Sequence, residues 1–94
     1  MGVQEIADKL KARVESSGFD RSVKLDLGAE GVIVIDGATI STTDAPADCT
    51  IRLSRDDLES LIAGDLSPTG AFMSGKIKVE GDMSVAMAVS QFLG

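Results

Sequence analysis

Residues 21–37 read RSVKLDLGAEGVIVIDG and predict two strands separated by a turn. From Arg21 to Leu27, apolar and polar residues alternate, which is the pattern of a half-buried strand. After the turn at residues 28–31, the β-branched run Val32–Ile35 is apolar on both faces, which favours a central strand covered on both sides. The next turn falls at residues 36–37. A sheet therefore forms the centre of the predicted fold.

The segments on either side add a helix and two strands. Apolar residues recur at helical spacing over residues 3–16, and Gly18 is a typical helix stop. Residues 38–41 predict a short third strand. The polar stretch 42–48 predicts a loop or an excursion at the sheet edge, and alternation returns in a fourth strand over residues 49–54.

Two helices are expected next. Ser54 followed by Asp57 is a variant of the capping box, and the helix that it starts ends at Gly64. Ser67 before Pro68 is a second helix start, because the serine hydroxyl can cap free amides and proline is tolerated in the first turn. A short helix over residues 68–74 follows from this.

The chain closes with a strand over residues 76–80 and a helix that Asp82 caps and that runs to about residue 93. This order of elements predicts an α+β fold, with a five-stranded, mostly antiparallel sheet and helices packed on one face. Helical segments separate the fourth and fifth strands, so that connection can be a crossover. At 94 residues, with no repeat and no linker, we expect residues 1–94 to form a single domain.

The residue inventory argues against catalysis. The chain has no His, Tyr or Trp and only one Cys, so histidine acid–base chemistry and imidazole zinc sites are excluded. Cys49 lies on the apolar face of its predicted strand and fits an inert small side chain better than a nucleophile. Gly70 and Gly75-Lys76 have the spacing of a phosphate-binding loop, but Ile77 replaces the required Ser or Thr and a strand follows. We therefore expect no enzyme, no cofactor and no metal.

Charge and hydropathy limit the partners. The net charge is −6, and only Lys76 and Lys78 lie close together on one predicted strand face, which argues against nucleic acid. The longest uncharged stretch, residues 83–94, is too short for a transmembrane span, which needs about 20 residues. A lone Cys and the absence of a recognisable leader predict a cytoplasmic location.

The last helix is the most informative anomaly. Its only polar side chains after Asp82 are Ser84, Ser90 and Gln91, so it is apolar almost all round. A surface helix normally has a polar face, and this helix therefore needs covering on more than one side. Other elements of the same chain, a second subunit or an apolar ligand could each supply that cover. On physical grounds alone, ordinary core packing plus a homodimer contact explains this pattern as well as an apolar ligand does.

From Asp48 onward the sequence resembles the sterol carrier protein type 2 family of small lipid-binding domains. The resemblance is carried by residues 48–54, by residues 64–68 and most strongly by AFMSGKIKVEGDM at residues 71–83, followed by Ala86-Met87. It implies a short stand-alone member of that family, in which the sheet and the C-terminal helices enclose an apolar tunnel for a sterol, fatty acid, acyl-CoA or phospholipid chain. Serine at position 74 and alanine at position 88 depart from the residues common in that family.

The resemblance implies non-catalytic lipid binding and lipid transport. The lipid-binding residues that we expect, from the resemblance and from the apolar last helix, are Phe72, Met73, Met83, Ala86, Met87, Val89 and Phe92. The alternative is a protein-interaction or accessory module, in which the apolar last helix forms a contact with a second subunit or a partner.

Overall fold

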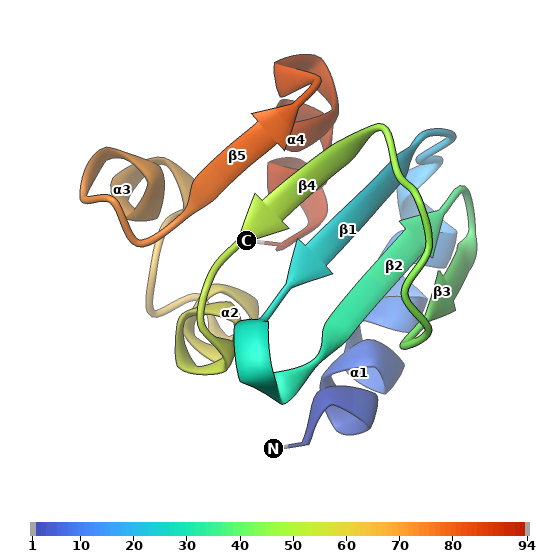
Figure 1. The fold of residues 1–94 in the computed structure, drawn as a ribbon, viewed down its shortest axis with the longest axis horizontal. Coiled ribbons are helices and arrows are strands. Elements are labelled where there is room, and N and C mark those ends of the chain that lie inside the picture. The colour runs from blue at the N-terminus through green and yellow to red at the C-terminus, as the bar shows by residue number, and fades with distance from the viewer. Residues whose placement is uncertain (1, 94) are drawn as a thin grey trace.

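The computed structural model describes the backbone of residues 2–93 and the side chains of residues 2–91 (Figure 1). The helices and strands are α1 (Val3–Ser17), β1 (Ser22–Asp26), the 3-10 turn η1 (Gly28–Glu30), β2 (Val32–Asp36), β3 (Thr39–Ser41), β4 (Cys49–Arg52), α2 (Arg55–Ala63), α3 (Pro68–Met73), β5 (Lys78–Gly81) and α4 (Met83–Leu93). The order of helices and strands expected from the sequence is confirmed.

The five strands form one sheet in the order β3-β2-β1-β4-β5. Three of the four pairings are antiparallel, and β1 pairs with β4 in parallel. A mostly antiparallel sheet is thus confirmed. The crossover lies elsewhere than expected, because β4 and β5 are antiparallel neighbours. It is the loop at residues 42–48 that carries the chain from the edge strand β3 past β2 and β1 to β4.

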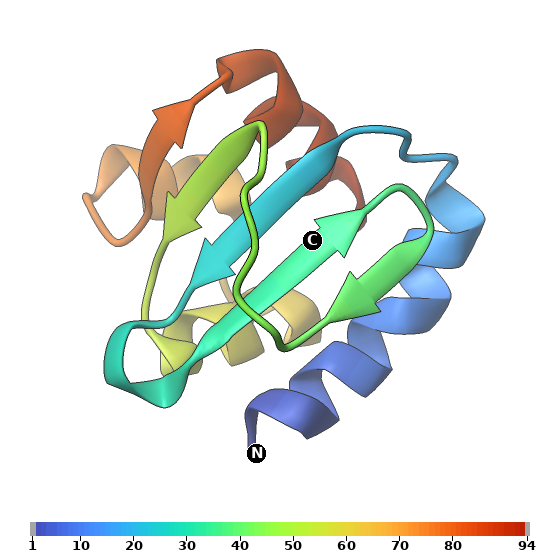
Figure 2. The same cartoon turned by 45° about the vertical axis from the view of Figure 1, so that its right-hand side comes forward.

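This loop runs across the sheet face that the helices leave uncovered (Figure 2). Lys24 of β1 holds it by an ion pair between Nζ and Oδ1 of Asp44 at 2.7 Å. Lys24 and Val34 are register partners on that face, and Val34 is 6% exposed. Burial of Val34 outside the main core explains why β2 is apolar on both sides.

The core lies between the sheet and the helices on its other face. α1 packs against β2 and β3, and α4 packs against β1, β4 and β5. The helices therefore divide the sheet between them, as expected for helices packed on one face. The buried side chains come from both layers and include Ile6, Leu10, Val14, Val23, Leu25, Ile33, Ile35, Ile51, Leu58, Leu61, Val85 and Val89.

Local hydrogen bonds confirm most of the predicted helix boundaries. Ser54 Oγ accepts a bond from the Asp57 amide at 3.0 Å, and Ser67 Oγ accepts one from the Gly70 amide at 2.9 Å. The fifth strand starts two residues later than expected. The amides of residues 76 and 77 donate to the Ala71 carbonyl, which closes the end of α3, and they do not pair in the sheet.

Candidate functional site

An apolar hollow of about 170 Å³ lies between α3, α4 and the inner face of β4 and β5. All but two of its lining residues are apolar, and the exceptions are Thr69 and Ser90. The lining consists of Ile51, Leu53, Leu61, Pro68, Thr69, Phe72, Ile77, Val79, Met83, Ala86, Met87 and Ser90. None of these side chains titrates, so the hollow has no acid, base or charged nucleophile of its own.

The geometry of α4 explains why this helix is apolar almost all round. Four of its residues line the hollow, namely Met83, Ala86, Met87 and Ser90, and their spacing places them on one face. Val85 and Val89 lie on another face and are 1% and 0% exposed in the core. The helix thus has one stripe in the core and a second stripe on the hollow.

The rim of the hollow carries large apolar side chains that face solvent. Phe72 is 47% exposed, Met83 is 48% exposed and Met87 is 67% exposed. A contiguous exposed apolar patch on a small domain commonly marks an interaction site. Methionine side chains are unbranched and flexible, so they can follow the shape of an apolar guest.

The structure places the expected lipid-binding residues in three different settings. Phe72, Met83, Ala86 and Met87 line the hollow. Val89 points into the core, and Met73 is 81% exposed and does not line the hollow. The side chain of Phe92 lies outside the described residues.

The strand and loop residues of the hollow were not foreseen from the sequence. Alternation predicts that Ile51, Leu53, Ile77 and Val79 face inward, and Ile51 and Val79 are indeed register partners. An inward position, however, can border a hollow or a packed core, and the pattern does not distinguish the two. Leu61, Pro68, Thr69 and Ser90 carried no signal beyond their helix positions.

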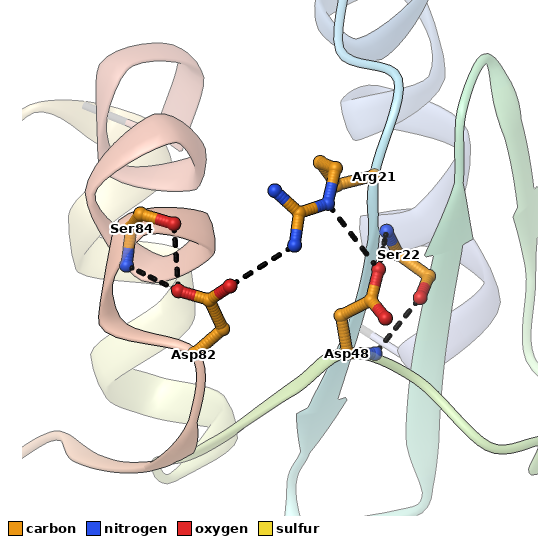
Figure 3. Close-up of polar contacts among 5 residues, drawn as sticks. All are labelled: Arg21, Ser22, Asp48, Asp82 and Ser84. Carbon is orange, nitrogen blue, oxygen red and sulfur yellow. Dashed lines mark hydrogen bonds and ion pairs between the residues drawn. The ribbon is translucent and has the colours of Figure 1, made fainter.

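A polar network holds the start of α4 against the sheet (Figure 3). Arg21 Nη2 donates to Asp82 Oδ2 at 3.0 Å, and Arg21 Nε lies 3.5 Å from Asp48 Oδ2. Ser22 Oγ accepts a bond from the Asp48 amide at 2.8 Å. Asp82 Oδ1 in turn accepts bonds from the Ser84 amide at 2.9 Å and the Ser84 hydroxyl at 2.6 Å. The predicted cap of the last helix is therefore confirmed.

The pKa values of Asp82 and Arg21 are shifted by the bonds of this network. The hydrogen bonds from Ser84, together with the bond from Arg21, lower the pKa of Asp82. The same Asp82 bond raises the pKa of Arg21. The network fixes where α4 begins and hence the position of the helix stripe that lines the hollow.

Two further features of the described residues bear on reactivity and on metal binding. Burial raises the pKa of the Cys49 thiol, which keeps it protonated. Among the described residues, no group of three or more His, Cys, Asp or Glu side chains is arranged to hold a metal ion. Within residues 2–93, none of the helices combines the length and the apolar character that crossing a membrane requires.

Known proteins share both the sequence pattern and the fold. Sterol carrier protein 2 of Oryctolagus cuniculus is 38% identical over 65 residues, which cover 64% of this chain and 12% of that protein. The chain thus spans only a small part of the curated relatives that it matches.

Two solved structures from Aedes aegypti superpose closely. The crystal structure of sterol carrier protein 2 like 2 has a TM-score of 0.79 at 23% identity and covers 95% of this chain and 94% of its own. The solution structure of the palmitated form of that protein also has a TM-score of 0.79 at 23% identity, covering 99% and 95%. At this identity the likeness establishes the fold.

The family model described as the SCP-2 sterol transfer family matches residues 3–94. Because this match runs through all but the first two residues, the chain belongs to the SCP-2 sterol transfer family.

Proposed function

We propose that this protein binds the hydrocarbon chain of a lipid, without catalysis, in the hollow between α3, α4, β4 and β5. The observation that carries the proposal is an almost wholly apolar hollow whose rim exposes Phe72, Met83 and Met87. Membership of a sterol transfer family supports it, as does the fold shared with a protein solved in a palmitated form.

The size of the hollow limits how the chain enters. Pockets for drug-sized ligands measure about 300–1,000 Å³, and an engineered apolar cavity of about 150 Å³ accepts benzene. A hollow of about 170 Å³ therefore holds only the end of a long chain as it stands. We expect Met83 and Met87 to swing outward when a longer chain enters, so that the hollow becomes an apolar tunnel.

The binding energy is modest. Each buried methylene contributes about 0.8 kcal/mol, whereas association and ordering together cost about 4–15 kcal/mol. Longer saturated chains should consequently bind more tightly until the opened hollow is full. Sterols, fatty acids, acyl-CoA and phospholipids all carry apolar hydrocarbon that the hollow can bury.

The test is direct. The protein is purified without detergent, its extract is analysed for lipids, and a fluorescent fatty acid is titrated into the delipidated protein. We expect saturable binding, and vesicle-to-vesicle exchange of labelled lipid would then test transfer. If no lipid copurifies and no saturable binding is measured, the proposal is overturned.

A matched pair of variants on α4 ties binding to the hollow. Ala86→Phe places a ring in the hollow, since Ala86 lines it, and should abolish or strongly weaken binding. Ala88→Phe adds the same ring on the side of α4 facing Arg13 and Ser17 and should leave binding intact. Thermal unfolding of both variants checks that each is folded.

A second candidate function is a subunit contact. The large apolar side chains that the described residues expose are Phe72, Met73, Met83 and Met87, which all belong to α3 and α4. A homodimer formed through this cluster would cover it. A concentration-dependent dimer that dissociates in Met87→Gln, with no lipid bound, would favour this function over lipid binding.

We also propose a cytoplasmic location. The lone Cys49 is a buried free thiol, which suits a reducing compartment. Fractionation of cells with an antibody to the native protein tests this proposal.

A further inference from the structure

The strand β5 lies at the outer edge of the sheet (Figure 1). Within residues 2–93 it pairs with β4 on one side and with no strand on the other. Three of its four residues are exposed, and Val79 is half-buried. An edge strand of this kind presents unpaired amides and carbonyls to any strand that can lie beside it.

One hydrogen bond shows which way the backbone of β5 faces. The Asp82 amide donates to the Asp48 carbonyl at 3.2 Å, which continues the register of the β4–β5 ladder. Because peptide groups alternate in direction along a strand, those of Lys78 and Glu80 face β4 as well. The amide and the carbonyl of Val79 therefore face the free edge, and no turn, loop or helix cap of the described residues bonds to them.

The charges of this segment are self-complementary. Residues 76–82 read KIKVEGD, so reversing the segment about Val79 exchanges its two lysines with its two acids. Val79 lines the apolar hollow, and side chains alternate between the faces of a strand. Lys78 and Glu80, which flank Val79, therefore both lie on the sheet face opposite to the hollow.

Lys78 lacks a partner of opposite charge on that face. It lies opposite Arg52 in the β4–β5 ladder, and like charges directly opposite each other are destabilising. Arg52 contacts Glu80 at 3.2 Å, whereas Lys78 forms no ion pair within the described part of the chain. A carboxylate placed beside the free edge of β5 would offset the repulsion between Lys78 and Arg52.

We infer that the free edge of β5 pairs antiparallel with β5 of a second copy of this chain, with Val79 opposite its counterpart. Lys78 of each copy then lies opposite Glu80 of the other, and the two Val79 residues exchange backbone hydrogen bonds. A two-fold axis between them makes each contact occur twice. The two five-stranded sheets become one continuous sheet with the helices of both copies on the same face.

The charge pattern also specifies the register of this pairing. Lysine on an edge strand commonly protects the edge, because an edge of one sign repels its own copy. Here the edge attracts its copy when Val79 is at the centre. A shift of two residues in either direction would place Lys78 opposite Lys78 or Glu80 opposite Glu80, and a shift of one would turn Val79 to the wrong face.

This contact runs along strand edges, so it is distinct from a contact through the exposed apolar side chains of α3 and α4. It also does not depend on lipid binding. A contact along one short strand is small, and interfaces below about 1,200 Å² are typically weak and transient. We therefore expect a dimer that forms at high protein concentration.

The experiment measures self-association of the delipidated protein by sedimentation velocity between about 10 μM and about 1 mM. Interference optics are used, because the chain has no Trp or Tyr. The proteins are the wild type, Lys78→Glu, Glu80→Lys, an equimolar mixture of these two variants, and Lys11→Glu. The last variant makes the same change of charge at an exposed position on α1.

We expect Lys78→Glu and Glu80→Lys each to weaken self-association by roughly tenfold, since each turns two attractive cross-strand pairs into two repulsive ones. The mixture should dimerise as the wild type does, because each new charge then lies opposite its complement in the other variant. Lys11→Glu should behave as the wild type.

A backbone variant tests the strand pairing without changing charge. Val79→Pro removes the amide that faces the free edge, where proline is tolerated because it interrupts no ladder bond. We expect this variant to remain folded and monomeric. Circular dichroism checks the fold of every variant, and if Glu80→Lys does not fold, Lys78→Glu and Val79→Pro decide the question.

Four results would overturn the inference. The first is a wild type that stays monomeric at about 1 mM. The second is a dimer that Lys78→Glu weakens no more than Lys11→Glu does, and the third is a dimer that survives Val79→Pro; both would place the contact elsewhere on the surface. The fourth is a mixture of folded Lys78→Glu and Glu80→Lys that does not pair.

Discussion

Arg21 Nη2 donates a hydrogen bond to Asp82 Oδ2 at 3.0 Å, although the two residues lie 61 positions apart. Arg21 precedes the central strand β1, and Asp82 precedes α4. Their contact therefore joins the middle of the sheet to the helix that forms one wall of the apolar hollow. Both side chains remain nearly half exposed, so the contact positions α4 more than it stabilises the fold.

The stability of the fold should fall in acid through Asp82. The pKa of Asp82 in the folded state lies below its ordinary value of 3.8. The stability that ionised Asp82 contributes to the fold is therefore complete above pH 3.8 and is lost as the pH falls through the folded-state pKa. Asp82→Asn should show a smaller loss of thermal stability between pH 5 and pH 2 than the wild type. The ion pair with Lys24 also lowers the pKa of Asp44. Part of the dependence of thermal stability on pH should therefore remain in Asp82→Asn. Circular dichroism melts across this range check the prediction, and identical slopes would contradict it.

Met87→Gln should weaken binding of a 16-carbon fatty acid by roughly three- to tenfold, since partial burial of this side chain against the ligand contributes about 1 kcal/mol. Met73→Gln is the matched control, because Met73 is also a flexible, exposed methionine but does not line the hollow. Fluorescence titration measures both. Equal losses in the two variants would mean that the hollow is not the binding site.

Val89→Ala should lower the free energy of unfolding by about 2 kcal/mol, because it removes buried carbon atoms and leaves a cavity. Val89 is 0% exposed and belongs to the core stripe of α4, so the folded variant should bind lipid as the wild type does. Urea unfolding and lipid titration are measured on the same sample. A loss of affinity at unchanged stability would place Val89 in the site instead.

Gly81→Ala should destabilise the protein more than Gly64→Ala. Both glycines have positive φ, at +98° and +83°, so each alanine adds about 1–2 kcal/mol of backbone strain. A Cβ at Gly81 would also lie 2.7 Å from the Asp48 carbonyl oxygen, whereas one at Gly64 would meet nothing within 4 Å. Overpacking of this kind costs about a further 1–3 kcal/mol. Urea unfolding of the two variants gives the difference, and equal losses would contradict the close contact.

Much of the fold could be read from local pattern. The alternation over residues 21–27 and 49–54, the serine caps at Ser54 and Ser67 and the apolar last helix each report on contacts within a few positions. Such signals predict which residues face inward. That residues 1–94 form a single, stand-alone domain stays a prediction.

Only part of the candidate site could be predicted from the sequence. Sequence reasoning named Phe72, Met83, Ala86 and Met87, which all line the hollow, partly from the family resemblance and partly because the last helix lacks a polar face; that they bind lipid stays a prediction. It did not separate Val89 from them, because the helix pattern does not say which apolar stripe meets the core.

The sequence by itself determined the kinds of elements, their order, the caps of the helices and the family, because these depend on side chains close together in the chain. Tertiary structure alone decided that β4 pairs in parallel with β1, that the loop at residues 42–48 crosses the sheet, and that an apolar hollow opens between α3, α4, β4 and β5. The physical reason is that a hollow exists between elements: its walls come from residues 51 to 90, and only the strand order and the docking of α4 bring them together.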